Sequence, residues 1–123
     1  NAMIRFNLGG LEVVHMGDVG HPLDAVQLDF LRGVDLLLAP TGGKPTIAID
    51  DLVAAIAETR PRVVIPMHFK TPKINLPIRP VEEFLAHPGL SGMTVRRFDN
   101  PTIFVTPADL PDATQIWVMP FAR

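Results

Sequence analysis

The stretch VDLLLAPTGGKPTIAIDDLVAAIAETRPRVVIPM, residues 34–67, decides the fold class of this chain. It opens with an almost continuous apolar run, Val34 to Ala39, and closes with a second one, Val63 to Met67, that is rich in β-branched residues. Such runs are typical of strands that are covered on both faces, as in a parallel sheet. Between them, apolar residues recur at helical spacing over residues 50–60. Strand, helix, strand is the βαβ rhythm, so the middle of the chain is predicted to be α/β.

The segment before this stretch predicts a hairpin and a short helix. Ile4–Leu8 and Leu11–Met16 are extended runs joined by a Gly-Gly pair, which is typical of a β-hairpin. Asp24, with Gln27 three residues later, matches a helical capping box, and Gly33 is placed to end that helix.

The segment after it predicts one more short helix and a return to strands. Pro80 to Ala86 fits a helix with proline in its first turn. Three further runs are predicted to be strands: Thr94–Phe98, Thr102–Val105 and Ile116–Met119.

Composition narrows the class of protein. With 123 residues, of which 47% are hydrophobic, the chain can bury the core of one domain, which we place at residues 3–123. The formal net charge of −2, without a basic cluster, gives little support to a nucleic-acid partner. No apolar run approaches the roughly 20 residues that span a bilayer, so we expect no membrane partner. The absence of cysteine excludes disulfides and thiolate metal ligands, and it is consistent with a cytoplasmic location.

The first residues have their own interpretation. Asn1 and Ala2 precede Met3 and resemble the remnant of a cleaved expression tag. Because Met3 leads straight into a strand-like run, we also expect that the chain can be one piece of a longer protein.

Three loops are candidates for a functional site because each follows the carboxyl end of a predicted strand, where open α/β sheets bind ligands. They are His15–His21, Pro40–Gly43 and Pro66–Lys70. Together they hold three of the four histidines, a carboxylate and a glycine pair. If the sheet is parallel, all three loops lie at one edge.

Each residue of these loops also has an ordinary structural interpretation. Asp18 can cap a turn, and His68 can be a buried histidine whose hydrogen bonds are satisfied by its surroundings. The His15 imidazole can hydrogen-bond to the backbone, and Gly42 and Gly43 can simply form a turn. His21 and Lys70 can be residues exposed to solvent. The fourth histidine, His87, stands in a predicted helix stop and is interpreted as structural.

Imidazole and carboxylate together are the usual protein ligands of a zinc site with an open position. A carboxylate can also bridge two metals that share a water molecule and lower its pKa towards neutrality. A catalytic zinc normally takes about three protein ligands, however, and the chain has no H-E-x-x-H and no H-x-H pair.

Three segments in this order and spacing resemble the second half of the metallo-β-lactamase superfamily, and most closely its lactonase-like branch, which includes ascorbate-6-phosphate lactonase relatives. They are His15–His21, Val34–Gly43 and Pro61–Phe69. The resemblance implies α/β architecture: half of an αββα sandwich, a mixed sheet with helices on one face. It covers nearly the whole chain.

The resemblance also implies roles for individual residues. Asp18 corresponds to the aspartate that bridges two metals, and His68 to a histidine that ligates one of them. His15 would belong with Asp18 to the catalytic machinery without ligating metal. The predicted substrate-binding residues are His21, Gly42, Gly43 and Thr46. Zinc is the expected cofactor, with manganese or iron as alternatives.

The H-x-H-x-D-H motif of the family's first half is missing from this chain. We therefore expect a fragment of a metal-dependent hydrolase of esters, lactones or phosphoesters, inactive by itself and acting on a small molecule when intact. The alternatives are a non-catalytic homo-oligomeric module and one chain of a split enzyme. Because half a sandwich leaves a sheet face uncovered, we expect a homo-oligomer or association with an N-terminal half, unless the chain was cut from a longer protein.

Overall fold

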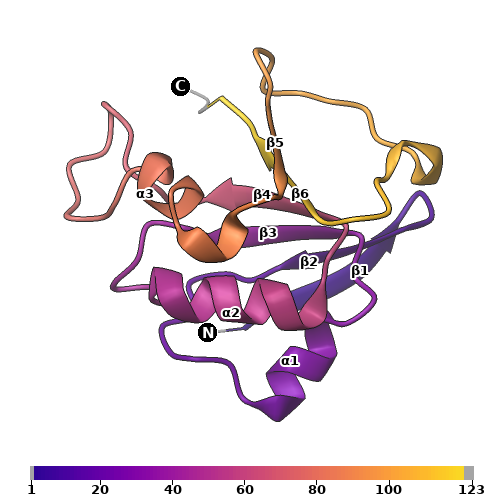
Figure 1. Cartoon of the computed structure of the whole chain (residues 1–123), viewed down its shortest axis with the longest axis horizontal. Coiled ribbons are helices and arrows are strands. Elements are labelled where there is room, and N and C mark those ends of the chain that lie inside the picture. The colour runs from indigo at the N-terminus through magenta and orange to yellow at the C-terminus, as the bar shows by residue number, and fades with distance from the viewer. Residues whose placement is uncertain (1, 121–123) are drawn as a thin grey trace.

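A computed structural model describes residues 2–120 of the chain. Asn1 of the predicted tag remnant and residues 121–123 of the predicted domain lie outside the described residues. Six strands form one sheet in the order β1-β2-β3-β4-β6-β5 (Figure 1). They are β1 (Ile4–Leu8), β2 (Leu11–His15), β3 (Leu36–Pro40), β4 (Val63–Met67), β5 (Thr94–Arg97) and β6 (Gln115–Val118).

The sheet is mixed, as the sequence predicts. β1 pairs with β2 antiparallel through the predicted hairpin, whereas the β2–β3, β3–β4, β4–β6 and β5–β6 pairs are all parallel. The carboxyl ends of β2, β3 and β4 therefore meet at one edge.

The helices are short and begin where the sequence signals indicate. They are α1 (Ala25–Leu31), α2 (Ile49–Thr59) and α3 (Val81–Leu85), with 3-10 turns η1 (Pro88–Leu90) and η2 (Pro107–Asp109). At the start of α1, the Asp24 carboxylate accepts from the Gln27 amide at 2.8 Å, and the Gln27 side chain accepts from the Asp24 amide at 3.1 Å. The predicted capping box is therefore confirmed.

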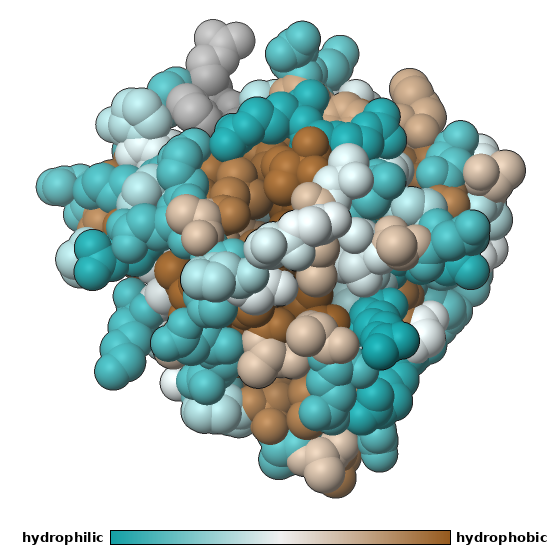
Figure 2. Space-filling view, in the orientation of Figure 1, coloured by the Kyte–Doolittle hydropathy of each residue, from teal (hydrophilic) through white to brown (hydrophobic). Residues whose placement is uncertain are grey.

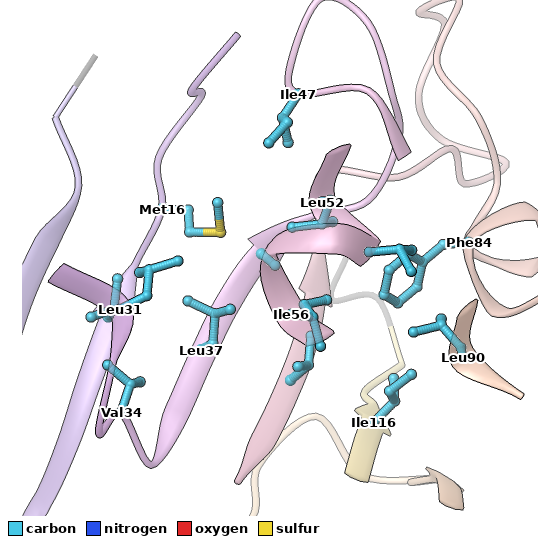
Figure 3. Packing of buried hydrophobic residues seen from close by; sticks show 14 of the residues in the cluster. Met16, Leu31, Val34, Leu37, Ile47, Leu52, Ile56, Phe84, Leu90 and Ile116 are labelled. Atoms are coloured by element: carbon cyan, nitrogen blue, oxygen red, sulfur yellow. The ribbon is translucent and has the colours of Figure 1, made fainter. Parts of the chain in front are cut away.

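The core lies between the helices and one face of the sheet. The register aligns Val14, Leu37, Val64 and Ile116 across four neighbouring strands, so these side chains share a face. They belong to one buried cluster with residues of the helices, among them Leu31, Leu52, Ile56, Phe84 and Leu90 (Figure 3). The predicted arrangement of helices on one face of the sheet is confirmed.

The opposite side of the sheet, which we call the helix-free face, is formed by the alternate residues of the same strands. Ile4 lies opposite His15 and Phe6 opposite Val13, and Leu38 continues the His15 row in β3. Towards β6, this face is closed by a stack in which the Arg96 guanidinium lies 4.8 Å from the Trp117 ring centroid and 4.9 Å from that of Phe98. Over the hairpin, Ile4, Phe6 and Leu8 are exposed, whereas Leu11 and Val13 on the same face are buried. A Cβ atom at Gly10 would lie 3.4 Å from the Pro107 side chain of η2, so the tip of the hairpin lies against the 107–109 turn.

One predicted strand is wrong. Residues 102–106 have no regular secondary structure, and the Phe104 side chain is 95% exposed. A strand needs a neighbour with which to exchange backbone hydrogen bonds. β5 is an edge strand that pairs with β6 on one side, and the Thr102–Val105 run does not pair with its other side.

Candidate functional site

The loops that follow β2, β3 and β4 are joined by backbone hydrogen bonds, so the predicted convergence of three loops is present. The Ile47 amide donates to the Val19 carbonyl at 2.6 Å, which ties the loop after β3 to the loop after β2. The Thr41 amide donates to the Met67 carbonyl at 2.9 Å, which ties the same loop to the end of β4.

Gly42 lies directly against the backbone of His68. A Cβ atom at Gly42 would stand 2.3 Å from the His68 carbonyl oxygen, closer than real contacts allow, and 3.2 Å from the Ile78 Cβ. The Gly42 carbonyl in turn accepts from the Arg79 amide at 2.8 Å. Glycine is therefore required at position 42 for this loop to pack beside His68.

His68 combines two unfavourable features. Its φ of 53° lies in the left-handed region, which is uncommon for a residue with a side chain. Its Nε2 atom is buried and has no hydrogen-bond partner among residues 2–120. The interpretation of His68 as a satisfied structural histidine requires such a partner, and buried polar atoms usually have one. Unsatisfied nitrogens and strained backbone are features that gather at functional sites.

The His68 side chain borders a cavity of about 240 Å³. Thr71 and Ile74 line it as well, and sequence reasoning missed both. They belong to the irregular segment that returns from β4 to α3, where no periodic pattern marks the side chains that turn inwards.

His15 and Asp18 stand on the exposed surface of the loop after β2. The His15 Nδ1 atom accepts from the Gly17 amide at 3.1 Å, so this ring nitrogen carries no proton and Nε2 carries it in the neutral ring. Gly17 has a φ of +64°, and a Cβ there would lie 2.9 Å from the Ala2 carbonyl. The Gly-Asp sequence thus allows the tight turn that presents Asp18.

The predicted substrate-binding residues are placed differently from one another. His21 is exposed, and its Nδ1 lies 2.8 Å from the Pro22 carbonyl. Thr46 is buried, and its hydroxyl donates to the Gly43 carbonyl at 2.7 Å, which braces the loop. Gly42 and Gly43 line a cavity of about 430 Å³.

His87 agrees with its structural interpretation. Its Nδ1 accepts from the Gly89 amide at 2.9 Å, and its Nε2 lies 2.6 Å from the Asp50 carboxylate. Both ring nitrogens are therefore engaged in closing η1 against the start of α2.

Residues 2–120 contain no group of three or more His, Cys, Asp or Glu side chains arranged to hold a metal ion. Asp18 and His68 offer the right donor types, and the buried, unpartnered Nε2 of His68 suits a metal ligand. Two such donors suit part of a metal site, because a catalytic zinc normally takes about three.

Comparison with known proteins assigns the chain to a family. The beta-lactamase superfamily domain matches residues 1–68, which is more than half of the chain and includes both Asp18 and His68. The chain belongs to this superfamily, and the predicted family resemblance is confirmed at this level.

Particular relatives agree with the assignment. The UPF0173 metal-dependent hydrolase of Carboxydothermus hydrogenoformans is 37% identical over 65 residues, covering 53% of this chain and 29% of the relative. That of Methanosarcina mazei is also 37% identical over 65 residues, covering 53% and 28%. A crystal structure from Thermotoga maritima, of a candidate Zn-dependent hydrolase of the metallo-beta-lactamase superfamily, matches with a TM-score of 0.75 and 31% identity. That match covers 94% of this chain and 56% of the Thermotoga chain.

The chain thus spans less than a third of the curated relatives and little more than half of the similar structure. Across the described part of the chain, no helix has the length and apolar character needed to cross a bilayer.

Proposed function

We propose that this chain supplies part of the active site of a metal-dependent hydrolase, with His68 and Asp18 as its metal ligands. The observation that carries the proposal is the buried Nε2 of His68, which has no partner within residues 2–120 and sits on a backbone in the left-handed region. The names of the relatives, which describe metal-dependent and Zn-dependent hydrolases, support the same function.

Zinc is the proposed metal, with manganese or iron as alternatives, and it would supply Lewis acidity and a water of lowered pKa. His68 would ligate through Nε2, the nitrogen that is left without a partner. Asp18 would ligate through its carboxylate and bridge two metal ions. His15, whose Nδ1 is held by the Gly17 amide, would keep its Nε2–H available to donate to a substrate or water oxygen.

The proposed substrate is a small ester, lactone or phosphoester, in line with the lactonase-like branch. The cavity of His68 shares Phe69, Thr71, Met119 and Pro120 with a neighbouring cavity of about 390 Å³. Figure 2 shows apolar side chains gathered beside α3 and the β5–β6 edge, where that cavity lies. Its charged lining residues are Lys70, Glu82, Arg97 and Asp99. An apolar floor with charged groups at the rim suits a metabolite with a hydrocarbon part and a polar group.

The remaining ligands would come from a second polypeptide segment, because residues 2–120 hold no cluster of three ligands. This proposal covers both a split enzyme and a longer protein. A non-catalytic role is the alternative, and it predicts no specific response of His68 to metal.

Zinc titration of the ¹⁵N-labelled chain, followed by the ring-nitrogen signals of its four histidines, tests the ligand assignment. We expect a shift of the His68 Nε2 signal, with His87 as an internal control because both of its nitrogens are engaged. Asp18→Asn should weaken zinc binding by roughly tenfold or more. A His68 signal that does not move at saturating zinc, or that moves no more than that of His87, would refute the assignment.

Activity is tested separately. The zinc-loaded chain would be assayed on chromogenic ester, lactone and phosphoester substrates, alone and with a separately expressed N-terminal half of a relative. Hydrolysis that appears only in the mixture and is lost in Asp18→Asn would support a shared site. Equal hydrolysis by Asp18→Asn and the parent chain would contradict it.

A further inference from the structure

We propose that the chain has a second binding site, for a small zwitterion with an apolar body such as an apolar amino acid. The site is a cavity at the amino ends of β4, β5 and β6. The inference goes beyond the hydrolase proposal and needs no metal. It rests on an arginine and an aspartate that line the same cavity without pairing with each other.

The cavity lies at the edge of the sheet opposite the proposed metal ligands. It measures about 470 Å³ and is lined by the end of α2 and by residues that directly precede the three strands. Pockets for small ligands measure about 300–1,000 Å³. His68 follows the carboxyl end of β4, and Figure 1 shows the β4–α3 loop and the end of α2 on opposite sides of the molecule. A ligand in this cavity therefore does not occupy the proposed active site.

Two opposite charges line this cavity. Arg60 and Asp112 both border it, and both are exposed. Within residues 2–120, neither side chain forms an ion pair or a hydrogen bond, with the other or with a third residue. A guanidinium binds a carboxylate, and a carboxylate accepts hydrogen bonds from an ammonium group. A zwitterion is the ligand that satisfies both side chains at once.

The backbone of Arg60 supports a role in binding. Within residues 2–120, Arg60 and His68 are the two non-glycine residues with a positive φ, 52° and 53°. Glycine is the usual residue where a helix ends in this left-handed conformation, because it has no Cβ to strain the backbone. Strained backbone of this kind gathers at ligand sites. Arg60 therefore shares with the proposed metal ligand a feature that folding alone does not favour.

The two charged walls of the cavity are tied together. The Thr114 hydroxyl donates to the Pro61 carbonyl at 2.6 Å, and the Gln115 amide donates to the Arg62 carbonyl at 2.9 Å. These bonds join the segment that follows Asp112 to the segment that follows Arg60. Walls that are already fixed lower the entropic cost of binding a ligand between them.

The cavity also has an apolar part, which defines the body of the ligand. Ile56 is buried and Met93 is half-buried, and both belong to or pack against the main core cluster. Ala57 and Ala113 add two small side chains to the lining. A hydrocarbon group placed here removes apolar surface from water on both sides of the contact. An apolar amino acid combines such a group with the two charges.

Titration of L-leucine into the ¹⁵N-labelled chain in a metal chelator, followed by the backbone amide signals, is the first test. We expect saturable shifts at Gly92 and Ala113, which line the cavity, and none at Gly42 or Gly43 at the other edge. Because metal is absent, failure of this result would leave the hydrolase proposal untouched. Shifts that stay linear up to the solubility limit of leucine, or that affect both edges alike, would overturn the site.

Analogues of leucine test the pairing of charges. Isocaproate keeps the carboxylate and the hydrocarbon body but lacks the amino group, whereas isoamylamine keeps the amino group but lacks the carboxylate. Each should bind roughly tenfold more weakly than leucine or worse, because each loses one charge-assisted contact. Glycine, which keeps both charges without the hydrocarbon body, should also bind more weakly. If any of the three bound as tightly as leucine, the zwitterion site would be refuted.

Charge-neutral variants assign each contact to its residue. Arg60→Gln should weaken leucine binding by about tenfold without weakening isoamylamine binding, and Asp112→Asn should weaken leucine binding without weakening isocaproate binding. Both side chains are exposed, so neither change should unfold the chain, and circular dichroism would confirm this. Arg79→Gln, which removes an exposed arginine at the other edge of the sheet, is the control and should leave leucine binding unchanged. Full leucine binding in either cavity variant, or equal loss in Arg79→Gln, would contradict the proposal.

Discussion

Replacing His68 by glycine tests whether this histidine is kept for binding rather than for stability. The substitution removes a side chain from a backbone with a φ of 53° and removes the buried Nε2 that has no partner among residues 2–120. If His68 serves metal binding, the metal-free variant should be more stable than the parent chain and should no longer be stabilised by zinc.

The expected size of the effect follows from four contributions. Relief of the left-handed conformation is worth about 1–2 kcal/mol, and removal of an unsatisfied buried polar atom about 1–3 kcal/mol. Against these, glycine gives the unfolded chain more freedom, which costs about 0.5–1 kcal/mol. Loss of the packing of a half-buried ring costs roughly another 1 kcal/mol. The net expectation is a gain of about 2 kcal/mol in the free energy of unfolding, or roughly 8 °C in Tm.

Arg60→Gly is the matched control. Arg60 ends α2 with a φ of 52°, nearly the same as that of His68. Its side chain is exposed, and it precedes the amino end of β4, whereas His68 follows the carboxyl end of that strand. Only strain relief and unfolded-state entropy apply there, so a gain of about 0.5 kcal/mol is expected.

Thermal and urea unfolding with and without zinc provide the measurement. In the parent chain zinc should raise the Tm, because a ligand that binds only the folded state stabilises it. In His68→Gly this rise should vanish, while in Arg60→Gly it should remain. A loss of more than about 1 kcal/mol in metal-free His68→Gly would show that the ring is a structural element, and the reasoning would be wrong.

Three further substitutions test the packing and the capping of the fold. Gly42→Ala should destabilise the chain by about 1–3 kcal/mol in urea unfolding, because its Cβ would meet the His68 carbonyl at 2.3 Å. Asp24→Ala should cost about 1 kcal/mol in the same assay through loss of the cap of α1. The Glu12 carboxylate accepts hydrogen bonds from the side chain of Asn7 and from that of Arg5, which hold its pKa below the ordinary value of 4.5. The ionised Glu12 carboxylate therefore stabilises the folded chain above pH 4.5, and this stabilisation is lost as the pH falls further. When Tm is measured as a function of pH, it should fall more steeply below pH 4.5 in the parent chain than in Glu12→Gln.

Much of the fold could be predicted from local sequence, because the elements that were found carry their own signals. The capping box at Asp24 and the two apolar runs of β3 and β4 are examples, and their ends differ from the prediction by one or two residues at most. The failure at Thr102–Val105 has the opposite cause. That run is rich in β-branched residues, as strands often are. Pairing, however, depends on a neighbour elsewhere in the chain, about which local sequence contains no information.

The candidate site was predicted in outline for a related reason. The ends of the strands can be located from the sequence, so the three loops could be placed at one edge of the sheet before their contacts were known. The left-handed backbone of His68 and the absence of a partner for its Nε2 within residues 2–120 could not be predicted, because backbone angles and hydrogen-bond partners depend on tertiary packing that local sequence does not specify. The roles assigned to His15, His21 and Thr46 remain predictions.

The order of the last two strands has a consequence for how the molecule assembles. β6 lies between β4 and β5, although it follows β5 in the chain, and within residues 2–120 β5 pairs with no other strand. During synthesis β5 must therefore wait, unpaired, until residues 115–118 have been made and have docked on β4. A ribosome that stalls shortly before that point would leave β5 without its partner strand, and Arg96 would have no indole ring against which to stack.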